Sequence, residues 1–335
     1  MHFDVTSGKW SPMSPSESRW PTAFVRLLLA VTLPVAFLAG CAQVPVSRLS
    51  APEREQVLGL RQTIDVAIAE TAQAAMPAAQ TGTTEDITVP GPAGPIRCRI
   101  YRPAQSAAPG TILFIHGGAW IAGSIDSHDP MARAICAATG VNLISVDYSR
   151  APEAMFPSQF EELRSVRRWI AREGARSGLS ASPLALCGDS AGGNMAAVLA
   201  REAANGSVAL VALINPVVDM TFASVQDAET RFFSELMIKS YVPAGVDVRD
   251  PALSPLLSAV PAMHPATFIA IGDQDPWRAE QDQYALKLRA AGVRVEVFRS
   301  ATGHLGPEGA AATENAMPTI RAVGEAIKRA FDARS

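Results

Sequence analysis

The sequence predicts an α/β fold with an eight-stranded, mostly parallel sheet, helices on both faces and a small helical cap. The first observation is an alternation of short apolar runs, typical of buried strands, with longer helical segments. The second is size. The chain has 335 residues, 48% of them hydrophobic and 18% charged. This suits one core domain of about 250 to 290 residues with an appendage.

The expected strands begin with a hairpin and continue as a parallel array. Residues 80–85 are polar and read as a loop, and the runs 86–90 and 96–102 are split by a Gly/Pro turn cluster at 91–95. Six more strands are expected at 111–116, 141–147, 184–188, 208–214, 266–272 and 293–299. Helices are expected at 51–79, 128–138, 158–174, 191–204, 277–291 and 313–332.

Four parts of the chain follow from this pattern. Residues 1–40 form a predicted signal peptide and 41–50 a tether. Residues 51–84 form an N-terminal helical cap segment, and 85–335 the main α/β domain. Residues 216–263 break the alternation with aromatic residues and prolines. We therefore expect a cap insertion over the carboxyl edge of the sheet at about 216–263.

The N-terminus reads as an export signal. Arg19 and Arg26 precede an apolar run at 27–39, which is too short for a bilayer-spanning helix of about 20 residues. Its end, Leu38-Ala39-Gly40-Cys41, resembles a bacterial lipobox. The resemblance implies cleavage before Cys41 and lipid attachment to it, which would hold the protein on a membrane in the cell envelope, at the periplasmic face of the inner or outer membrane. A secreted or periplasmic protein with an incidental Cys41 is the alternative.

Charge and cysteine content exclude other classes. The net charge of -3 and the lack of a basic stripe give no sign of nucleic-acid binding. Cys98, Cys136 and Cys187 fall in expected strands or helices and read as small buried hydrophobes. No C-x-x-C pattern suggests a zinc or redox site. Neither a metal nor an organic cofactor is implied.

Gly188, Ser190 and Gly192 form a G-x-S-x-G between an expected strand and an expected helix. This is the setting of a nucleophile elbow, a sharp turn that presents a serine hydroxyl at the carboxyl edge of the sheet. Glycines two residues on either side allow the strand and helix to approach closely. Ser190 is therefore the candidate nucleophile.

A nucleophilic serine needs a base and an acid that orients the base. His304 follows the last expected strand and is the candidate base. The preceding strand ends near Asp273 and Asp275. We favour Asp275 because the proline after it keeps it extended and starts a helix. Asp273 and Asp219, which follows an earlier strand, are the alternatives.

Backbone N–H groups should stabilise an oxyanion beside Ser190. Ala191 follows the nucleophile and supplies one. Gly117 and Gly118, in the run His116-Gly117-Gly118-Ala119-Trp120 after an early strand, should supply others, because glycine lets amides turn inward.

Together these motifs resemble serine esterases of the α/β-hydrolase fold, in the group similar to mammalian hormone-sensitive lipase. The matching runs lie at 116–120, 147–153, 156–157, 188–194, 275–277 and 290–293. The resemblance implies Ser190 as nucleophile, His304 as base and Asp275 as its partner. Ala119 stands where the family usually has a third glycine, but it keeps an N–H that can serve the oxyanion hole.

The resemblance implies a serine carboxylesterase that hydrolyses short-chain or small carboxylic esters through an acyl-enzyme. The expected binding partner of the protein is a small ester substrate. The substrate pockets are expected to be lined by the helix at 51–79, by Trp120 and by the cap. An arylformamidase-like amide hydrolase and an acetyl-ester deacetylase are alternatives. A non-catalytic binding lipoprotein on the same scaffold is a further one.

Overall fold

The computed structural model describes residues 2–4, 9–11, 49–75, 81–105, 108–203, 206–304 and 311–334. The chain separates into two units, Met1–Pro45 and Val46–Ser335. In the first unit, β1 (His2–Asp4) pairs antiparallel with β2 (Lys9–Ser11). The apolar run at 27–39, Cys41 and most of the predicted tether lie outside the described residues.

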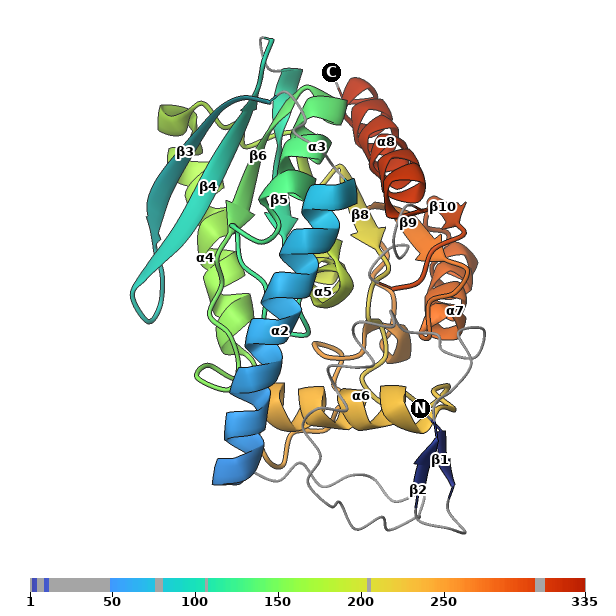
Figure 1. The fold of residues 1–335 in the computed structure, drawn as a ribbon. Coiled ribbons are helices and arrows are strands. Elements are labelled where there is room, and N and C mark those ends of the chain that lie inside the picture. Colours follow the sequence, from blue (N-terminus) through green and yellow to red (C-terminus); the bar gives the residue numbers. More distant parts are fainter. Residues whose placement is uncertain are drawn as a thin grey trace. The chain divides into compact units, whose positions relative to one another are not determined.

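The larger unit is built on an eight-stranded sheet in the order β10-β9-β8-β7-β5-β6-β4-β3 (Figure 1). β4 pairs antiparallel with β3 and β6, and every other pairing is parallel. The predicted fold class is confirmed. The strands are β3 (Thr81–Pro90), β4 (Pro95–Pro103), β5 (Ala108–Ile115), β6 (Val141–Val146), β7 (Leu184–Asp189), β8 (Leu210–Ile214), β9 (Ala266–Gly272) and β10 (Val295–Ser300).

The expected loop at 80–85 is wrong, because β3 already begins at Thr81. Thr81 pairs with Pro103, and Thr84 with Tyr101, across a register shift. β3 is the edge strand, and residues 82–86 are exposed, so this stretch carries no apolar pattern. Its strand conformation comes from hydrogen bonds to β4, which a reading of hydrophobic periodicity misses.

Helices cover both faces of the sheet. α3 and α8 pack together over one face, and α4 and α5 pack together over the other (Figure 1). The helices are α2 (Ala51–Ala75), α3 (Asp129–Thr139), α4 (Ser158–Glu173), α5 (Ser190–Glu202), α6 (Ala228–Tyr241), α7 (Arg278–Ala290) and α8 (Ala311–Asp332). Two short 3₁₀ turns are η1 (Gly174–Ser177) and η2 (Pro255–Leu257).

Alternate strand residues build the core beneath α3 and α8. Phe114 of β5, Cys187 of β7 and Phe268 of β9 belong to one buried cluster with Ile135 of α3 and Val323 of α8. Side chains two apart along a strand share a face, and the fully buried residues between them point to the other face. Both faces of the central strands are therefore apolar, as a parallel sheet covered on two sides requires.

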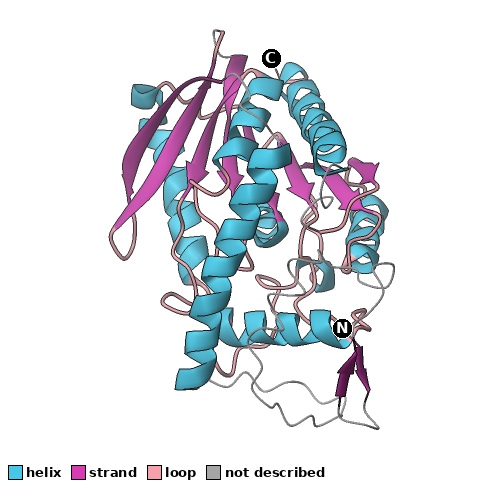
Figure 2. Cartoon of the chain, in the orientation of Figure 1, coloured by secondary structure: helices cyan, strands magenta, loops and turns pink. Residues whose placement is uncertain are grey.

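α6 is the longer helix of the segment 216–263 and lies beyond the carboxyl ends of the parallel strands (Figure 2). Asp227 caps it by accepting a hydrogen bond from the Thr230 N–H at 2.7 Å. Lys239 of α6 pairs with Glu53 of α2 at 3.0 Å. α2 and α6 thus contact each other at the edge of the sheet where the predicted site lies. The domain boundaries inferred from the sequence remain predictions.

The three described cysteines are buried free thiols: Cys98, Cys136 and Cys187. Burial raises the pKa of each thiol, so they pack as small hydrophobes, as expected. Within the described ranges, no helix combines the length and the apolar character needed to cross a bilayer.

Candidate active site

Ser190 lies at a sharp turn between β7 and α5. Its φ is +51°, a left-handed conformation that is strained for a serine. Gly188 and Gly192 make the turn sterically feasible. A Cβ on Gly188 would lie 2.5 Å from the Gly192 carbonyl, and one on Gly192 would lie 2.0 Å from the Ile115 carbonyl oxygen. The close approach expected at these glycines is therefore present.

Three predicted side chains meet at this turn. Ser190 Oγ is 2.7 Å from His304 Nε2, and His304 Nδ1 is 2.8 Å from Asp275 Oδ2. Asp275 follows β9 and His304 follows β10, so all three come from the carboxyl edge of the sheet. With its Nδ1 proton donated to Asp275, His304 presents Nε2 as an acceptor for the serine hydroxyl.

The acid and the base of this hydrogen-bonded chain of Ser190, His304 and Asp275, the relay, are buried. The side chain of Asp275 is 0% exposed and that of His304 is 5% exposed. The Trp277 ring meets the His304 ring edge-on at 4.4 Å. Asp275 Oδ1 accepts the N–H of Trp277 at 2.8 Å, and Oδ2 accepts Gln281 Nε2 at 3.0 Å. Such an enclosed, hydrogen-bonded carboxylate can orient an imidazole.

The two alternative acids are placed elsewhere. Asp273 is exposed and its carboxylate is 3.5 Å from Arg299. Asp219 is buried and accepts the N–H of Thr221 at 2.8 Å. The carboxylate that contacts His304 in the described structure is that of Asp275.

Asn215, to which no sequence motif assigns a role, holds the loop that carries His304. Asn215 Nδ2 donates to the His304 carbonyl oxygen at 3.1 Å, and its Oδ1 accepts the Gly272 N–H at 2.9 Å. Asn215 directly follows β8 and has a φ of +44°. Its side-chain amide thus links the end of β8 to the end of β9 and to the loop after β10. The place of Asn215 directly before a proline, after an expected strand, indicates a turn in the sequence but does not reveal these contacts.

The glycine loop after β5 packs against the turn that carries Ser190, where Gly117 contacts Asp189 and the His116 carbonyl lies close to Gly192. Gly118, Ala119 and Trp120 have positive φ values of +116°, +56° and +61°. The N–H groups of Gly118, Ala119 and Ala191 have no hydrogen-bond acceptor among the described residues. Unpaired backbone donors gathered at a nucleophile are the components of an oxyanion hole.

Gly117 does not belong with the free oxyanion donors that the sequence predicts. Its N–H donates to Asp189 Oδ1 at 3.0 Å, so this amide is already engaged and is not free to bind an oxyanion. The sequence could not reveal this, because it depends on how the acid beside the nucleophile is turned. Gly118, Ala119 and Ala191 remain the candidate donors.

Buried rings support the glycine loop from behind. The His116 ring stacks on Tyr148 at 4.2 Å, and the Tyr148 hydroxyl donates to the His116 carbonyl oxygen at 2.9 Å. His128 Nε2 lies 3.4 Å from Asp189 Oδ2. Burial lowers the pKa of His116 to about 3, so its imidazole is neutral at physiological pH. His264, half-buried, contacts the carbonyl oxygen of Pro265 instead.

The N-terminal helix and the cap hold the outer side of the same loop. Arg61 of α2 donates to the carbonyl oxygens of Ile121 and Ala151, each at 2.6 Å. The Trp120 ring stacks on Tyr241 of α6 at 4.8 Å and is fully buried. Trp120 was expected to line a substrate pocket; its contacts instead show it bracing the loop against the cap.

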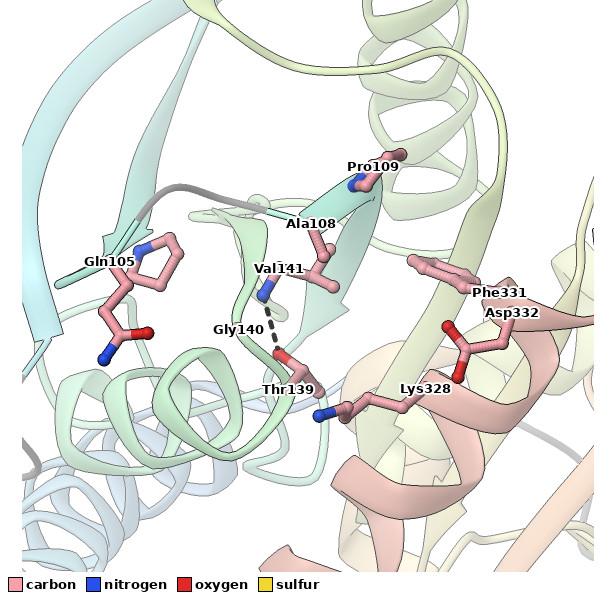
Figure 3. Close-up of a pocket in the computed structure, with 10 residues that line it drawn as sticks. Gln105, Ala108, Pro109, Thr139, Gly140, Val141, Lys328, Phe331 and Asp332 are labelled. Carbon is pink, nitrogen blue, oxygen red and sulfur yellow. Dashed lines mark hydrogen bonds between the residues drawn. The ribbon is translucent and has the colours of Figure 1, made fainter. Parts of the chain in front are cut away.

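A separate hollow of about 240 Å³ lies at the opposite edge of the sheet (Figure 3). It is bordered by the start of β5 at Ala108, the start of β6 at Val141, and Lys328 and Phe331 of α8. None of the predicted site residues lines it. The hollow is therefore separate from the candidate site at Ser190.

Comparison with known proteins places these features in a family. A family profile described as an alpha/beta hydrolase fold matches residues 112–304. The carboxylic ester hydrolase LipN of Mycobacterium tuberculosis is 36% identical over 233 residues, which are 63% of this chain and 61% of LipN. The match thus spans less than two thirds of LipN.

An ethyl acetate hydrolase of Pseudomonas putida is 33% identical over 213 residues, which are 59% of this chain and 67% of that protein. Among solved structures, an esterase of Pyrobaculum calidifontis superposes with a TM-score of 0.71 at 27% identity. The superposed part covers 82% of this chain and 93% of the esterase chain.

Proposed function

Because this chain belongs to the α/β hydrolase family, we propose that it is a carboxylic ester hydrolase with Ser190, His304 and Asp275 as its catalytic triad. The observation that carries the proposal is the unbroken relay from Ser190 Oγ through His304 to Asp275, at 2.7 and 2.8 Å. The relatives named above, an ester hydrolase, an ethyl acetate hydrolase and an esterase, support ester hydrolysis.

In the first half of the reaction, Ser190 Oγ attacks the ester carbonyl carbon while His304 Nε2 takes the serine proton. The carbonyl oxygen becomes an oxyanion and accepts the N–H groups of Gly118, Ala119 and Ala191. Each such donor is worth about 3 kcal/mol in the transition state. The imidazolium then donates its proton to the leaving alkoxide, which departs as the alcohol and leaves an acyl group on Ser190.

In the second half, water attacks the acyl-enzyme. His304 removes one water proton and returns it to Ser190 Oγ as the carboxylic acid leaves. Asp275 stays ionised throughout and keeps the Nδ1 proton of His304 in place. The completeness of the relay speaks against a non-catalytic binding protein.

The proposed substrates are esters with short acyl chains. A relative that acts on ethyl acetate supports this choice. We would measure hydrolysis of p-nitrophenyl esters from acetate to palmitate, and of an aryl formamide, with the purified protein. The proposal expects the highest kcat/KM on short chains. Preferred turnover of the formamide would support the amide-hydrolase alternative, and no ester turnover would refute the proposal.

A lipid anchor on Cys41 is a second part of the proposal. It rests on the lipobox-like run 38–41 after the apolar segment. Full-length protein expressed in a bacterium with a lipoprotein pathway should fractionate with membranes and carry a lipid-sized mass increment on Cys41. The Cys41→Ser variant should lose both. A parent protein found soluble with an unmodified Cys41 would refute the anchor and leave the ester-hydrolase proposal untouched.

A further inference from the structure

The side-chain amide of Gln281, in α7, contacts the carboxylate of Asp275. Its Nε2 donates to Asp275 Oδ2 at 3.0 Å, and the same oxygen accepts His304 Nδ1 at 2.8 Å. The Gln281 residue is fully buried. We propose that Gln281 is a positioning residue, which fixes the orientation of Asp275 and through it that of His304. This inference rests on the proposed function.

The carboxylate needs a second restraint. Asp275 Oδ1 is held by the Trp277 N–H at 2.8 Å. Besides the bond to His304, which the carboxylate has to orient, this one hydrogen bond leaves the carboxyl group able to rotate, because the terminal torsion of an aspartate has a broad energy minimum. The amide of Gln281 acts on the other oxygen. Two donors on two oxygens set the plane of the carboxylate, and that plane sets the direction in which Oδ2 meets the imidazole.

Both donors come from one turn of chain. Gln281 lies four residues after Trp277, and its N–H is bonded to the Trp277 carbonyl oxygen at 3.3 Å. Residues four apart on a helix lie on the same face. Trp277, the N-cap residue of α7, and Gln281, in the first turn of the helix, therefore supply a backbone N–H and a side-chain amide to the same carboxylate.

The orientation of the Gln281 amide favours this role over packing alone. Its Oε1 is buried without a hydrogen-bond partner among the described residues. An unpaired buried carbonyl is destabilising. Flipping the amide would aim Oε1 at the Asp275 carboxylate, oxygen against oxygen, which is worse. The Gln281 side chain thus leaves Oε1 without a partner while Nε2 donates to Asp275.

The test compares two methionine variants of α7. Gln281→Met keeps the length of the side chain and removes the donor. Gln283→Met makes the same change at an exposed position of the same helix. For each, we would measure the second-order rate of Ser190 modification by a fluorophosphonate, and kcat and KM for p-nitrophenyl butyrate. Thermal unfolding would establish that both variants are folded.

We expect Gln281→Met to lower the labelling rate and kcat about tenfold, with KM within about twofold of the parent. Gln283→Met should match the parent. Parent-like labelling and kcat in Gln281→Met would overturn the inference, as would a loss confined to KM, which indicates a changed pocket. If Gln281→Met does not fold, Gln281→Asn, which draws the amide away from Asp275, is held to the same criteria.

The two proposals fail in different ways. A parent protein that labels at Ser190 but hydrolyses no ester refutes the proposed function, and the labelling rates still decide the role of Gln281. A parent protein that neither labels nor hydrolyses esters overturns both.

Discussion

Asp189, the residue before Ser190, holds the glycine loop like a clamp, because its Oδ1 accepts the Gly117 N–H at 3.0 Å. Its Oδ2 lies 3.4 Å from His128 Nε2. Burial acts to raise the pKa of Asp189, but attraction to His128 and the hydrogen bond from Gly117 outweigh it and leave the pKa below its usual value. An ionised carboxylate next to Ser190 therefore fixes the first amide of the loop and leaves the later ones free.

Removing this clamp should weaken catalysis. Asp189→Ala frees Gly117 and lets the loop shift, so we expect kcat for a short-chain ester to fall about 10- to 100-fold. Asp189→Asn keeps an acceptor oxygen and should lose less. Steady-state kinetics of the folded variants measures this, with the exposed Asp273→Ala as control. A parent-like kcat in Asp189→Ala would contradict the assigned role.

The elbow should not tolerate a side chain at Gly192. A Cβ there would lie 2.0 Å from the Ile115 carbonyl oxygen and 2.5 Å from that of His116. Backbone atoms on both sides cannot move aside, so Gly192→Ala should lower the free energy of unfolding by about 3 kcal/mol. Urea denaturation tests this.

Gly59 of α2 supplies the matched control for the elbow. A Cβ there meets nothing within 4 Å. Gly59→Ala should raise the free energy of unfolding by about 0.5 to 1 kcal/mol, because alanine restricts the unfolded chain and favours a helix. Equal effects of the two substitutions would contradict the steric account of the elbow.

Burial of His116 makes stability depend on pH. Its pKa falls from an ordinary value of 6.5 to about 3 in the folded protein. Between these values the unfolded chain binds a proton that the folded chain does not. The contribution of His116 to the free energy of unfolding is therefore fully present above pH 6.5 and is lost as the pH falls towards 3. The loss from this group between pH 6.5 and pH 4 is about 3 kcal/mol.

The measurement is the free energy of unfolding of the parent and of His116→Gln at several pH values from 4 to 7. Glutamine does not titrate, so the variant should lose less stability on acidification. The low pKa of Asp189 adds a loss in the same direction, but this loss develops mainly below the ordinary pKa of 3.8, so the difference between the curves from pH 4 to 7 reports His116. Parallel curves would show that His116 does not carry the effect.

Much of the site could be predicted because parallel strands end at one edge of a sheet. Ser190, Asp275 and His304 each follow such a strand, and their residue types fit one chemistry. The roles of Asn215, Asp189 and Gln281 could not be predicted. Asp189 and Gly117 are 72 positions apart, and Asn215 and His304 are 89 apart. Such pairs are selected by side-chain packing, which periodicity does not describe.

The direct test of the central claim is hydrolysis of p-nitrophenyl butyrate by Ser190→Ala. Without the hydroxyl no acyl-enzyme forms, so kcat should fall by at least about 10⁴-fold while the protein stays folded. The control is the exposed Ser207→Ala, which should keep the parent rate. Hydrolysis by Ser190→Ala at the parent rate would contradict the account.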